Sequence, residues 1–234
     1  MVESQIKSKQ RVADYGEVKT SEREVTSMLD LVKQETERVD SRFLEPACGD
    51  GNFVVEILRR KLNAARKRAT LRGSKKPVPS EFERQSVMAV ASIYGVDLLA
   101  DNVEECRQRL YDIWNAEYQA VCKGEVSEDC RDAVRFILQR NIVCGNALTL
   151  MCVDENQQDT NEEIVFSEWS FPFNDARIQR KDFSFREMLE RSSEEESIRQ
   201  TGQLSLFANQ NDEIEPTLLR QYITDYRRLG KDGK

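Results

Sequence analysis

The chain is organised around one stretch, Arg42-Phe-Leu-Glu-Pro-Ala-Cys-Gly-Asp-Gly-Asn-Phe-Val-Val-Glu-Ile-Leu58. A short apolar run at its start is followed by Gly49 and Gly51, and a helical pattern begins at Val54. This order predicts a strand, a tight turn and a helix. Glycine reaches positive φ without a Cβ clash and lets a ligand lie against the backbone. The helix begins with free N–H groups that can face a polar ligand.

Length and composition predict a soluble domain. The 234 residues can bury a full core as one domain, with room for an appendage. Charged residues make up 33% of the chain and hydrophobic residues 39%, and no apolar run is long enough to span a membrane. The first residues, Met1-Val-Glu-Ser-Gln5, are polar and lead into no signal-peptide core. We therefore expect a cytoplasmic protein without membrane contact.

Cysteine and histidine usage excludes several kinds of site. The 6 cysteines are scattered without a C-x-x-C pair, and the chain has no histidine. We therefore expect neither a metal site nor a disulfide framework. The missing histidine also excludes Ser–His and Cys–His nucleophile systems.

The charge is unevenly distributed along the chain. The net charge is −7, yet residues 59–76 carry nine Lys or Arg and no acid, which leaves −16 on the remainder. This basic segment is either a contact for the phosphate backbone of DNA or a solvated helix end and loop. The sequence leaves both interpretations open.

Two further strand-and-turn patterns follow the glycine stretch. Ile93-Tyr-Gly-Val-Asp97 ends in an acid, as in Rossmann-type folds that hold ribose hydroxyls at a strand end. Asn141-Ile-Val-Cys-Gly-Asn-Ala-Leu148 places Asn146 directly after a glycine. An amide there can hydrogen-bond a ligand, or it can serve a turn. Asp97 can likewise be a ribose ligand or a helix cap.

A helix is predicted before the first strand. Ser21 and Glu24 fit the S-x-x-E capping box, and apolar residues recur at helical spacing from Val25 to Val32.

The glycine stretch resembles a known family. Glu45-Pro-Ala-Cys-Gly-Asp-Gly-Asn-Phe53 is similar to the D-P-A-C-G-S-G-N-F loop of S-adenosylmethionine-dependent DNA methyltransferases, in particular the adenine-specific (N-6) DNA methylases of restriction–modification systems. The likeness covers roughly residues 12–190. Gly16-Glu-Val-Lys-Thr-Ser21 resembles the family's G-E-V-[FY]-T-P, with Lys19 for the aromatic residue and Ser21 for the proline. Residues 95–102 and 141–148 resemble two further family motifs.

The resemblance implies a fold, a cofactor and a set of contacts. The fold class would be α/β, a Rossmann-like class I methyltransferase fold with a partial sheet, an N-terminal helix and a helical C-terminal tail. The cofactor would be S-adenosyl-L-methionine, with its ribose on Asp97, its adenine amine on Asn146 and its methionine end under the segment around Thr20. The implied cofactor-binding residues are Thr20, Glu45, Pro46, Gly49, Gly51, Asn52, Asp97, Leu98, Asn146 and Leu148.

The catalytic motif of the family is present only as a partial copy. The family's [DNS]-P-P-[YFW] loop accepts hydrogen bonds from the target amine and stacks its aromatic ring on the flipped base. The chain has no Pro-Pro. Ser170-Phe-Pro-Phe173 supplies a serine, one proline and an aromatic residue, so the implied catalytic residues are Ser170, Pro172 and Phe173. The alternative is that these aromatic residues pack as a lid or at an interface.

Three regions are predicted: an N-terminal helical segment at 1–40, a cofactor-binding domain at 41–175 and a C-terminal extension at 176–234. The domain would have four strands, the last at 163–166. The extension would contain a charged linker at 192–197, a Gln- and Asn-rich stretch at 202–212 and a helix at 216–229. Because the fourth strand would leave an open edge, we expect a partner chain or the extension to cover it.

Two functions therefore remain as expectations. The chain is either the cofactor-binding portion of a DNA adenine methyltransferase, completed by another polypeptide, or a catalytically degenerate binding or regulatory subunit of a restriction or phage-defence system.

Overall fold

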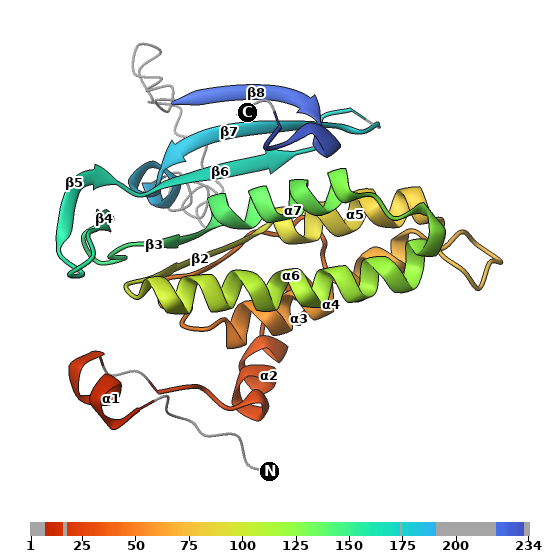
Figure 1. Ribbon diagram of the computed structural model, residues 1–234. Coiled ribbons are helices and arrows are strands. Elements are labelled where there is room, and N and C mark those ends of the chain that lie inside the picture. The colour runs from red at the N-terminus through yellow and green to blue at the C-terminus, as the bar shows by residue number, and fades with distance from the viewer. Residues whose placement is uncertain (1–7, 16–17, 174, 191–218, 232–234) are drawn as a thin grey trace, which may run out of the picture.

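The computed structural model describes residues 8–15, 18–173, 175–190 and 219–231, which form a mixed α/β structure (Figure 1). The described strands form three sheets: β1-β2-β3, β4-β5 and β6-β7-β8. The predicted linker at 192–197 and the polar stretch at 202–212 lie outside the described residues. No helix within the described ranges is long and apolar enough to cross a membrane.

The central sheet is small and parallel. Its strands are β1 (Phe43–Glu45), β2 (Ile93–Asp97) and β3 (Ile142–Cys144), with β2 in the middle. Leu44 pairs with Tyr94, and Val96 pairs with Val143. Because all three strands run in the same direction, the turns after Glu45, Asp97 and Cys144 lie together at the carboxyl ends of the strands. Each of these turns carries one of the three predicted motifs.

Four helices surround this sheet and extend beyond it. They are α4 (Asn52–Arg68), α5 (Pro79–Ala91), α6 (Ala100–Cys122) and α7 (Glu128–Asn141). Helices α5 and α7 lie on the side of the sheet β6-β7-β8, and α4 and α6 lie on the other side (Figure 1). On α6 the buried residues recur every three or four positions and include Leu110, Trp114 and Tyr118. The Trp114 and Tyr118 rings stack with centroids 4.7 Å apart.

The N-terminal region is helical, as predicted. It contains α1 (Lys9–Tyr15), α2 (Glu22–Asp30) and α3 (Lys33–Thr36). The predicted capping box is present, because the Ser21 hydroxyl accepts from the Glu24 N–H and the Glu24 carboxylate accepts from the Ser21 N–H. The helical pattern predicted from Val54 is also confirmed, because it lies within α4.

A second, antiparallel sheet packs over α5 and α7. It consists of β6 (Val165–Ser170), β7 (Arg177–Ser184) and β8 (Arg220–Asp225), and a separate hairpin is formed by β4 (Met151–Val153) and β5 (Asp159–Glu163). The chain turns through η1 (Lys123–Glu125) and, near its end, η2 (Tyr226–Arg228). The boundary predicted at 175 falls between β6 and β7, which pair with each other.

Two sequence predictions about strands and helices are wrong. The run at 163–166 does not form a fourth strand of the central sheet, because β6 pairs antiparallel with β7. In the described part of the helix predicted at 216–229, which begins at residue 219, the chain instead forms β8 followed by η2. The stretch Tyr222-Ile-Thr224 favours a strand, and pairing with β7 overrides the helical spacing of Leu219, Ile223 and Tyr226. Among the described strands β1 and β3 each pair only with β2, so both edges of the central sheet, at β1 and at β3, are unpaired.

A buried carboxylate fastens the end of the chain to the helices. Glu83 on α5 accepts hydrogen bonds from the Tyr118 hydroxyl (2.6 Å) and the Tyr226 hydroxyl (2.5 Å). Arg227 donates to the same carboxylate, with Nη2 at 2.6 Å. Because Glu83 is buried, these donors replace the water that would otherwise solvate its charge.

We therefore expect Glu83→Gln to lower the free energy of unfolding by about 2–3 kcal/mol, since charge-assisted bonds from buried partners are lost. Urea denaturation followed by circular dichroism measures the change. Glu81→Gln, on the same helix but more exposed, is the matched control and should have little effect. Equal unfolding midpoints for Glu83→Gln and the unmodified chain would contradict this role for Glu83.

Candidate functional site

A cavity of about 620 Å³ opens at the carboxyl ends of the three parallel strands. Its wall comes from four segments that are far apart in the sequence: residues 18–20, the glycine loop after β1, the turn between β2 and α6, and the turn after β3. This volume is in the range of sites that hold small ligands and cofactors. The three turns that carry the predicted motifs therefore share one cavity.

Nearly all of the predicted cofactor residues line this cavity. They are Thr20, Glu45, Pro46, Gly49, Asn52, Asp97, Leu98, Asn146 and Leu148. Gly51 is the exception, because it lies beneath the loop as the residue before α4, with φ of 101°. A Cβ at that position would come within 2.8 Å of the Cys106 sulfur. Gly51 therefore permits the close contact between the loop and α6 and does not line the cavity.

Asp97 holds the glycine loop in place. Its carboxylate accepts hydrogen bonds from the Gly49 N–H (2.9 Å), the Leu99 N–H (2.9 Å) and the Asn102 side-chain amide (3.2 Å). A carboxylate offers about four lone-pair positions, so about one remains for a ligand. Both interpretations of Asp97 from the sequence therefore fit its position: it fixes the turn at the start of α6, and it lines the cavity.

Asp50 is neutralised by two cations. Its side chain is only 6% exposed and forms ion pairs with Lys19 and with Arg109, whose Nη1 lies 3.1 Å from the carboxylate. Arg109 also donates to the Asp50 carbonyl (2.7 Å) and to Asn52 Oδ1 (3.0 Å). Asp50 is the last residue but one before α4, so a carboxylate already sits at the N-terminal end of this helix.

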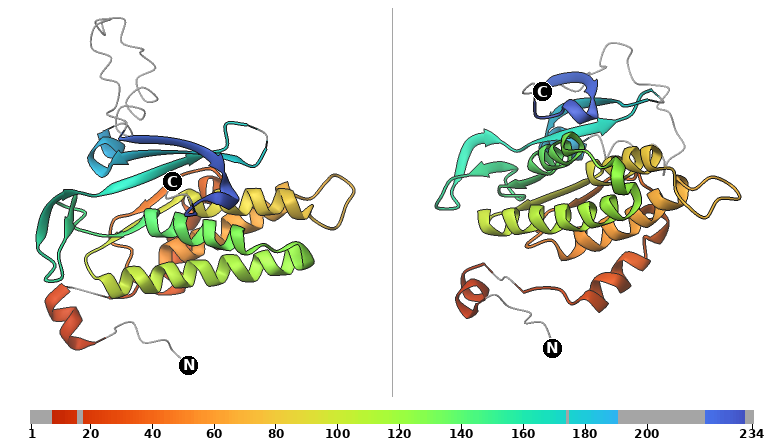
Figure 2. Two further views of the ribbon diagram at one scale, coloured as in Figure 1. Left: turned by 45° about the horizontal axis from the view of Figure 1, so that its top comes forward. Right: turned by 45° about the vertical axis from the view of Figure 1, so that its right-hand side comes forward.

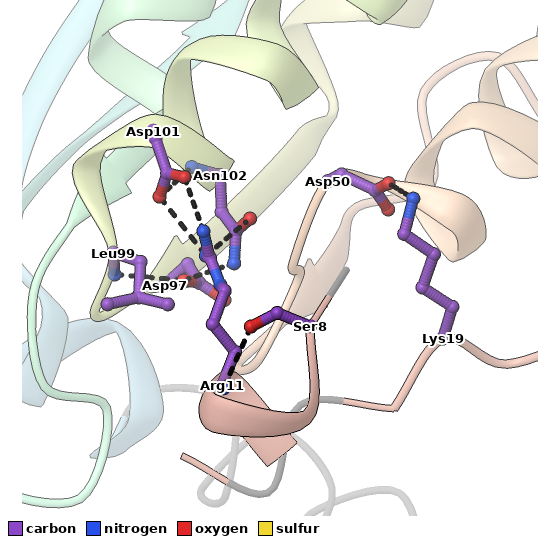
Figure 3. A network of polar contacts seen from close by, with 8 residues as sticks. All are labelled: Ser8, Arg11, Lys19, Asp50, Asp97, Leu99, Asp101 and Asn102. Atoms are coloured by element: carbon purple, nitrogen blue, oxygen red, sulfur yellow. Dashed lines mark hydrogen bonds and ion pairs between the residues drawn. The ribbon is translucent and has the colours of Figure 1, made fainter. Parts of the chain in front are cut away.

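The N-terminal segment is fastened across the site at two places (Figure 3). Lys19 reaches Asp50, and the Thr20 carbonyl accepts from the Asn52 side chain at 3.1 Å. Further back, Arg11 on α1 pairs with Asp101 at 2.5 Å and donates to Asn102 Oδ1 at 3.2 Å. These two attachments hold residues on either side of 16–17 against the glycine loop and against the start of α6.

Sequence reasoning did not find the parts played by Lys19, Arg11 and Arg109. The sequence held a signal for Lys19, because two differences from the motifs that the chain resembles occur together. Lys19 stands where the resembled N-terminal motif has an aromatic residue, Asp50 stands where the resembled glycine loop has a serine, and the two side chains form an ion pair. Nothing in the sequence connects Arg11 with Asp101, which lies 90 residues away.

The cavity carries more negative than positive charge. Glu45 accepts only a long hydrogen bond from the Ala47 N–H (3.4 Å), and burial raises the pKa of its carboxyl. Among the lining residues that the structure describes, Lys19 is the one cation, and Asp50 already engages it. Glu45 and Asp97 therefore face the cavity without a paired cation from its wall.

Two other candidate chemistries have no support at this cavity. A hydrogen bond with Cys106 and burial both raise the pKa of the Cys48 thiol, so the reactive thiolate is disfavoured. Within the described ranges, no three His, Cys, Asp or Glu side chains are grouped to hold a metal ion.

Asn146 is occupied by local hydrogen bonds. Its Oδ1 accepts from the Leu148 N–H at 3.0 Å and its Nδ2 donates to Asp159 Oδ1 at 3.0 Å. The side chain thus organises the turn after β3, and only a rearrangement would free its amide for a ligand. Leu148 is 95% exposed at the mouth of the cavity, and Leu98 is less exposed.

The predicted catalytic residues are not brought to the cavity. Ser170, Pro172 and Phe173 are absent from its lining. Ser170 pairs with Gln179 in the antiparallel sheet, and the Phe173 ring stacks under the Arg177 guanidinium at 3.9 Å. Strand β6 runs away from the cavity toward α5 and α7 (Figure 1). At its end, Phe171 packs against Tyr226, with ring centroids 5.9 Å apart.

The Lys19–Asp50 ion pair should restrain residues 18–20. We expect Lys19→Met to speed hydrogen exchange of their amides about fivefold, because a partly buried ion pair worth about 1 kcal/mol is lost. Hydrogen exchange followed by mass spectrometry measures this. Lys33→Met removes an exposed lysine whose pair with Glu37 spans 3.8 Å and should leave these amides unchanged. Equal exchange in the two variants would show that the ion pair does not hold the segment.

Comparisons with protein-family models, with curated proteins and with solved structures found no match to this chain. Functional assignment therefore depends on the geometry of the cavity and on the sequence motifs that line it.

Proposed function

We propose that this chain binds S-adenosyl-L-methionine in the cavity and is the cofactor-binding part of an adenine-specific DNA methyltransferase of a restriction–modification system. On this proposal the three parallel strands and their helices are a partial Rossmann-like, class I methyltransferase fold. The observation that carries the proposal is the charge of the cavity wall, where Glu45 and Asp97 have no paired cation among the described lining residues.

This charge favours a cationic cofactor over a phosphate-bearing one. A dinucleotide would place its pyrophosphate at the N-terminal end of the helix after the glycine loop. In this chain the two cations next to that end, Lys19 and Arg109, are already bound to the Asp50 carboxylate and are therefore not free to bind a phosphate. S-adenosylmethionine has a sulfonium and an ammonium against one carboxylate, so its net charge is positive and complements the wall.

The residues of the wall suit the parts of this cofactor. The remaining lone pair of Asp97 would accept from a ribose hydroxyl, and Leu98 and Leu148 would flank the adenine. The carboxylate of Glu45 would face the positive charge. Thr20, held through its carbonyl by Asn52, would close the cavity over the methionine end.

Methyl transfer needs acceptors for the target amine as well as the cofactor. S-adenosylmethionine supplies an electrophilic methyl group, and the enzyme orients the amine in line with it. Because Ser170, Pro172 and Phe173 do not line the cavity, the proposal assigns the catalytic loop and target recognition to another chain. A strand added to the open edge of β1, parallel to it, would bring its carboxyl end to the cavity.

The packing of Phe171 on Tyr226 favours a second candidate function. If the stretch after β6 serves only to hold the sheet, the chain is a catalytically degenerate methyltransferase fold. Its role would then be that of a binding or regulatory subunit in a restriction or phage-defence system.

Calorimetric titration tests cofactor binding. We expect saturable binding of S-adenosylmethionine, about tenfold weaker binding of S-adenosylhomocysteine, which lacks the sulfonium charge, and none of NAD. Glu45→Gln should weaken S-adenosylmethionine about tenfold and leave the affinity for S-adenosylhomocysteine nearly unchanged. Glu104→Gln, exposed on α6, is the matched control. Glu45 is a cleaner probe than Asp97, because replacing Asp97 also frees the glycine loop.

The same titration has a pH dependence of defined sign. Burial raises the pKa of Glu45, so its carboxylate takes up a proton at a pH above the ordinary glutamate value. Affinity for the cationic cofactor should be full well above this pKa and should fall as the pH drops through it. The Glu45→Gln variant should lack this fall. Tighter binding at lower pH, or binding of NAD as strong as that of S-adenosylmethionine, would contradict the charge argument.

Transfer of labelled methyl groups to DNA separates the two candidate functions. The purified chain alone should give no methylated adenine, since no acceptor loop lines the cavity in the described part of the chain. Adding the candidate partner chain should produce methylation that the Glu45→Gln variant supports less well. If cofactor binding is intact and no partner restores transfer, the degenerate subunit is the better description. Transfer by the chain alone would overturn the need for a partner.

A further inference from the structure

The structure divides the basic segment 59–76 into two parts with different roles. The part on α4 is largely engaged within the protein. Lys61 is buried and donates to the carbonyls of Arg38, Val39 and Ser41. Three arginines of this part also have acidic partners: Arg60 with Asp30 and Glu56, Arg66 with Glu117, and Arg68 with Asp40.

The second part is a loop between α4 and α5, residues 70–77, which we call the basic loop. Its cations are Arg72, Lys75 and Lys76, all exposed, and they form no ion pair with the described residues. A bridge between Thr70 and Pro77 closes the loop at its base. The nearest acid after it, Glu81, already accepts from Arg84 and Gln85.

The backbone of the basic loop is ordered without the help of a hydrophobic anchor. Leu71, its large apolar side chain, is 65% exposed. Gly73 turns the chain with φ of 86°, and the Ser74 hydroxyl bonds both the N–H and the carbonyl of Lys76. The loop projects beyond the ends of α4 and α5 in all views (Figures 1 and 2). It therefore presents three unpaired positive charges on a fixed turn and buries no apolar side chain.

We propose that the basic loop binds the phosphate backbone of a nucleic acid. Lysine and arginine side chains are the usual phosphate ligands, and they release counterions from the nucleic acid on binding. The chain outside residues 59–76 carries −16, so it repels a polyanion and confines it to this end of the molecule. Binding such a partner would also reduce the repulsion among the like charges of the basic loop, which contains no acidic residue.

The position of the basic loop defines its task. The loop follows the last turn of α4, whereas the cavity lies at the first turn of this 17-residue helix. At 1.5 Å per residue the two sites are separated by about 25 Å, which corresponds to about seven base pairs. The loop thus anchors a nucleic acid at a distance from the cavity and reads no base there. This inference adds an anchoring surface to the proposed function but does not depend on cofactor binding.

Fluorescence anisotropy of the full chain with labelled duplex DNA tests the proposal. We expect saturable binding at about 50 mM salt that weakens steeply as salt is added. The variant Arg72→Ser/Lys75→Ser/Lys76→Ser should bind at least about tenfold more weakly, and its log–log salt slope should be smaller by about 2.7. Duplex RNA and single-stranded DNA, measured in parallel, establish which source of phosphate is preferred.

A matched control removes three exposed cations elsewhere, Arg23→Ser/Lys33→Ser/Arg186→Ser, and gives the same net charge. It should bind nearly as well as the unmodified chain. The proposal is overturned if no nucleic acid binds, if the loop variant binds normally, or if the control loses as much affinity. Circular dichroism verifies folding, and titration with S-adenosylmethionine reports the cavity, to which the loop contributes no lining residue.

Discussion

The Asp97 residue joins the turns after all three parallel strands. Its carboxylate accepts from the Gly49 N–H after β1, and its carbonyl accepts from the Gly145 N–H after β3 at 2.9 Å. The same carboxylate holds the first residues of the turn into α6. The cavity lies between these turns. Asp97 holds them in register, because its carboxylate and carbonyl oxygens accept hydrogen bonds from the N–H groups of each turn. Short strands with few ladder bonds depend on such connections.

A second constraint is the charge of Asp50, which the fold places at the end of α4 without exposing it to solvent. A carboxylate with so little exposure needs cationic partners, and Lys19 and Arg109 provide them from two directions. One consequence is mechanical, because Lys19 carries the N-terminal segment with it. The other is chemical, because a neutralised Asp50 leaves Glu45 as the carboxylate with the most freedom to meet a ligand. Stability of the loop and charge of the cavity thus arise from the same pair.

The sequence predicted the parts of the molecule that local signals determine. Glycines, apolar spacing and the Ser21–Glu24 capping box predicted the helix after Ser21, the helix that follows the glycine stretch and the strand-and-turn pattern of three motifs. The pairing of β6 and β8 was not predicted, because the partner of an antiparallel strand can lie anywhere in the chain. The residue pattern of one strand does not identify that partner. For the same reason the Lys19–Asp50 pair was not predicted. For Asn146 the sequence left two interpretations open, a ligand contact and a turn residue.

The direction of β6 accounts for what this chain lacks at its cavity. A parallel strand beside β1 would end at the cavity mouth, whereas β6 runs toward α5 and α7 and delivers Ser170 to their side. The chain therefore uses its own later strands to cover helices and leaves the edge of β1 unpaired by any described strand. On the proposed function, this topology assigns cofactor binding to the present chain and leaves the acceptor loop to the polypeptide that pairs with that edge. On the same proposal, the absence of Pro-Pro from the sequence and the unpaired edge of β1 have one common explanation.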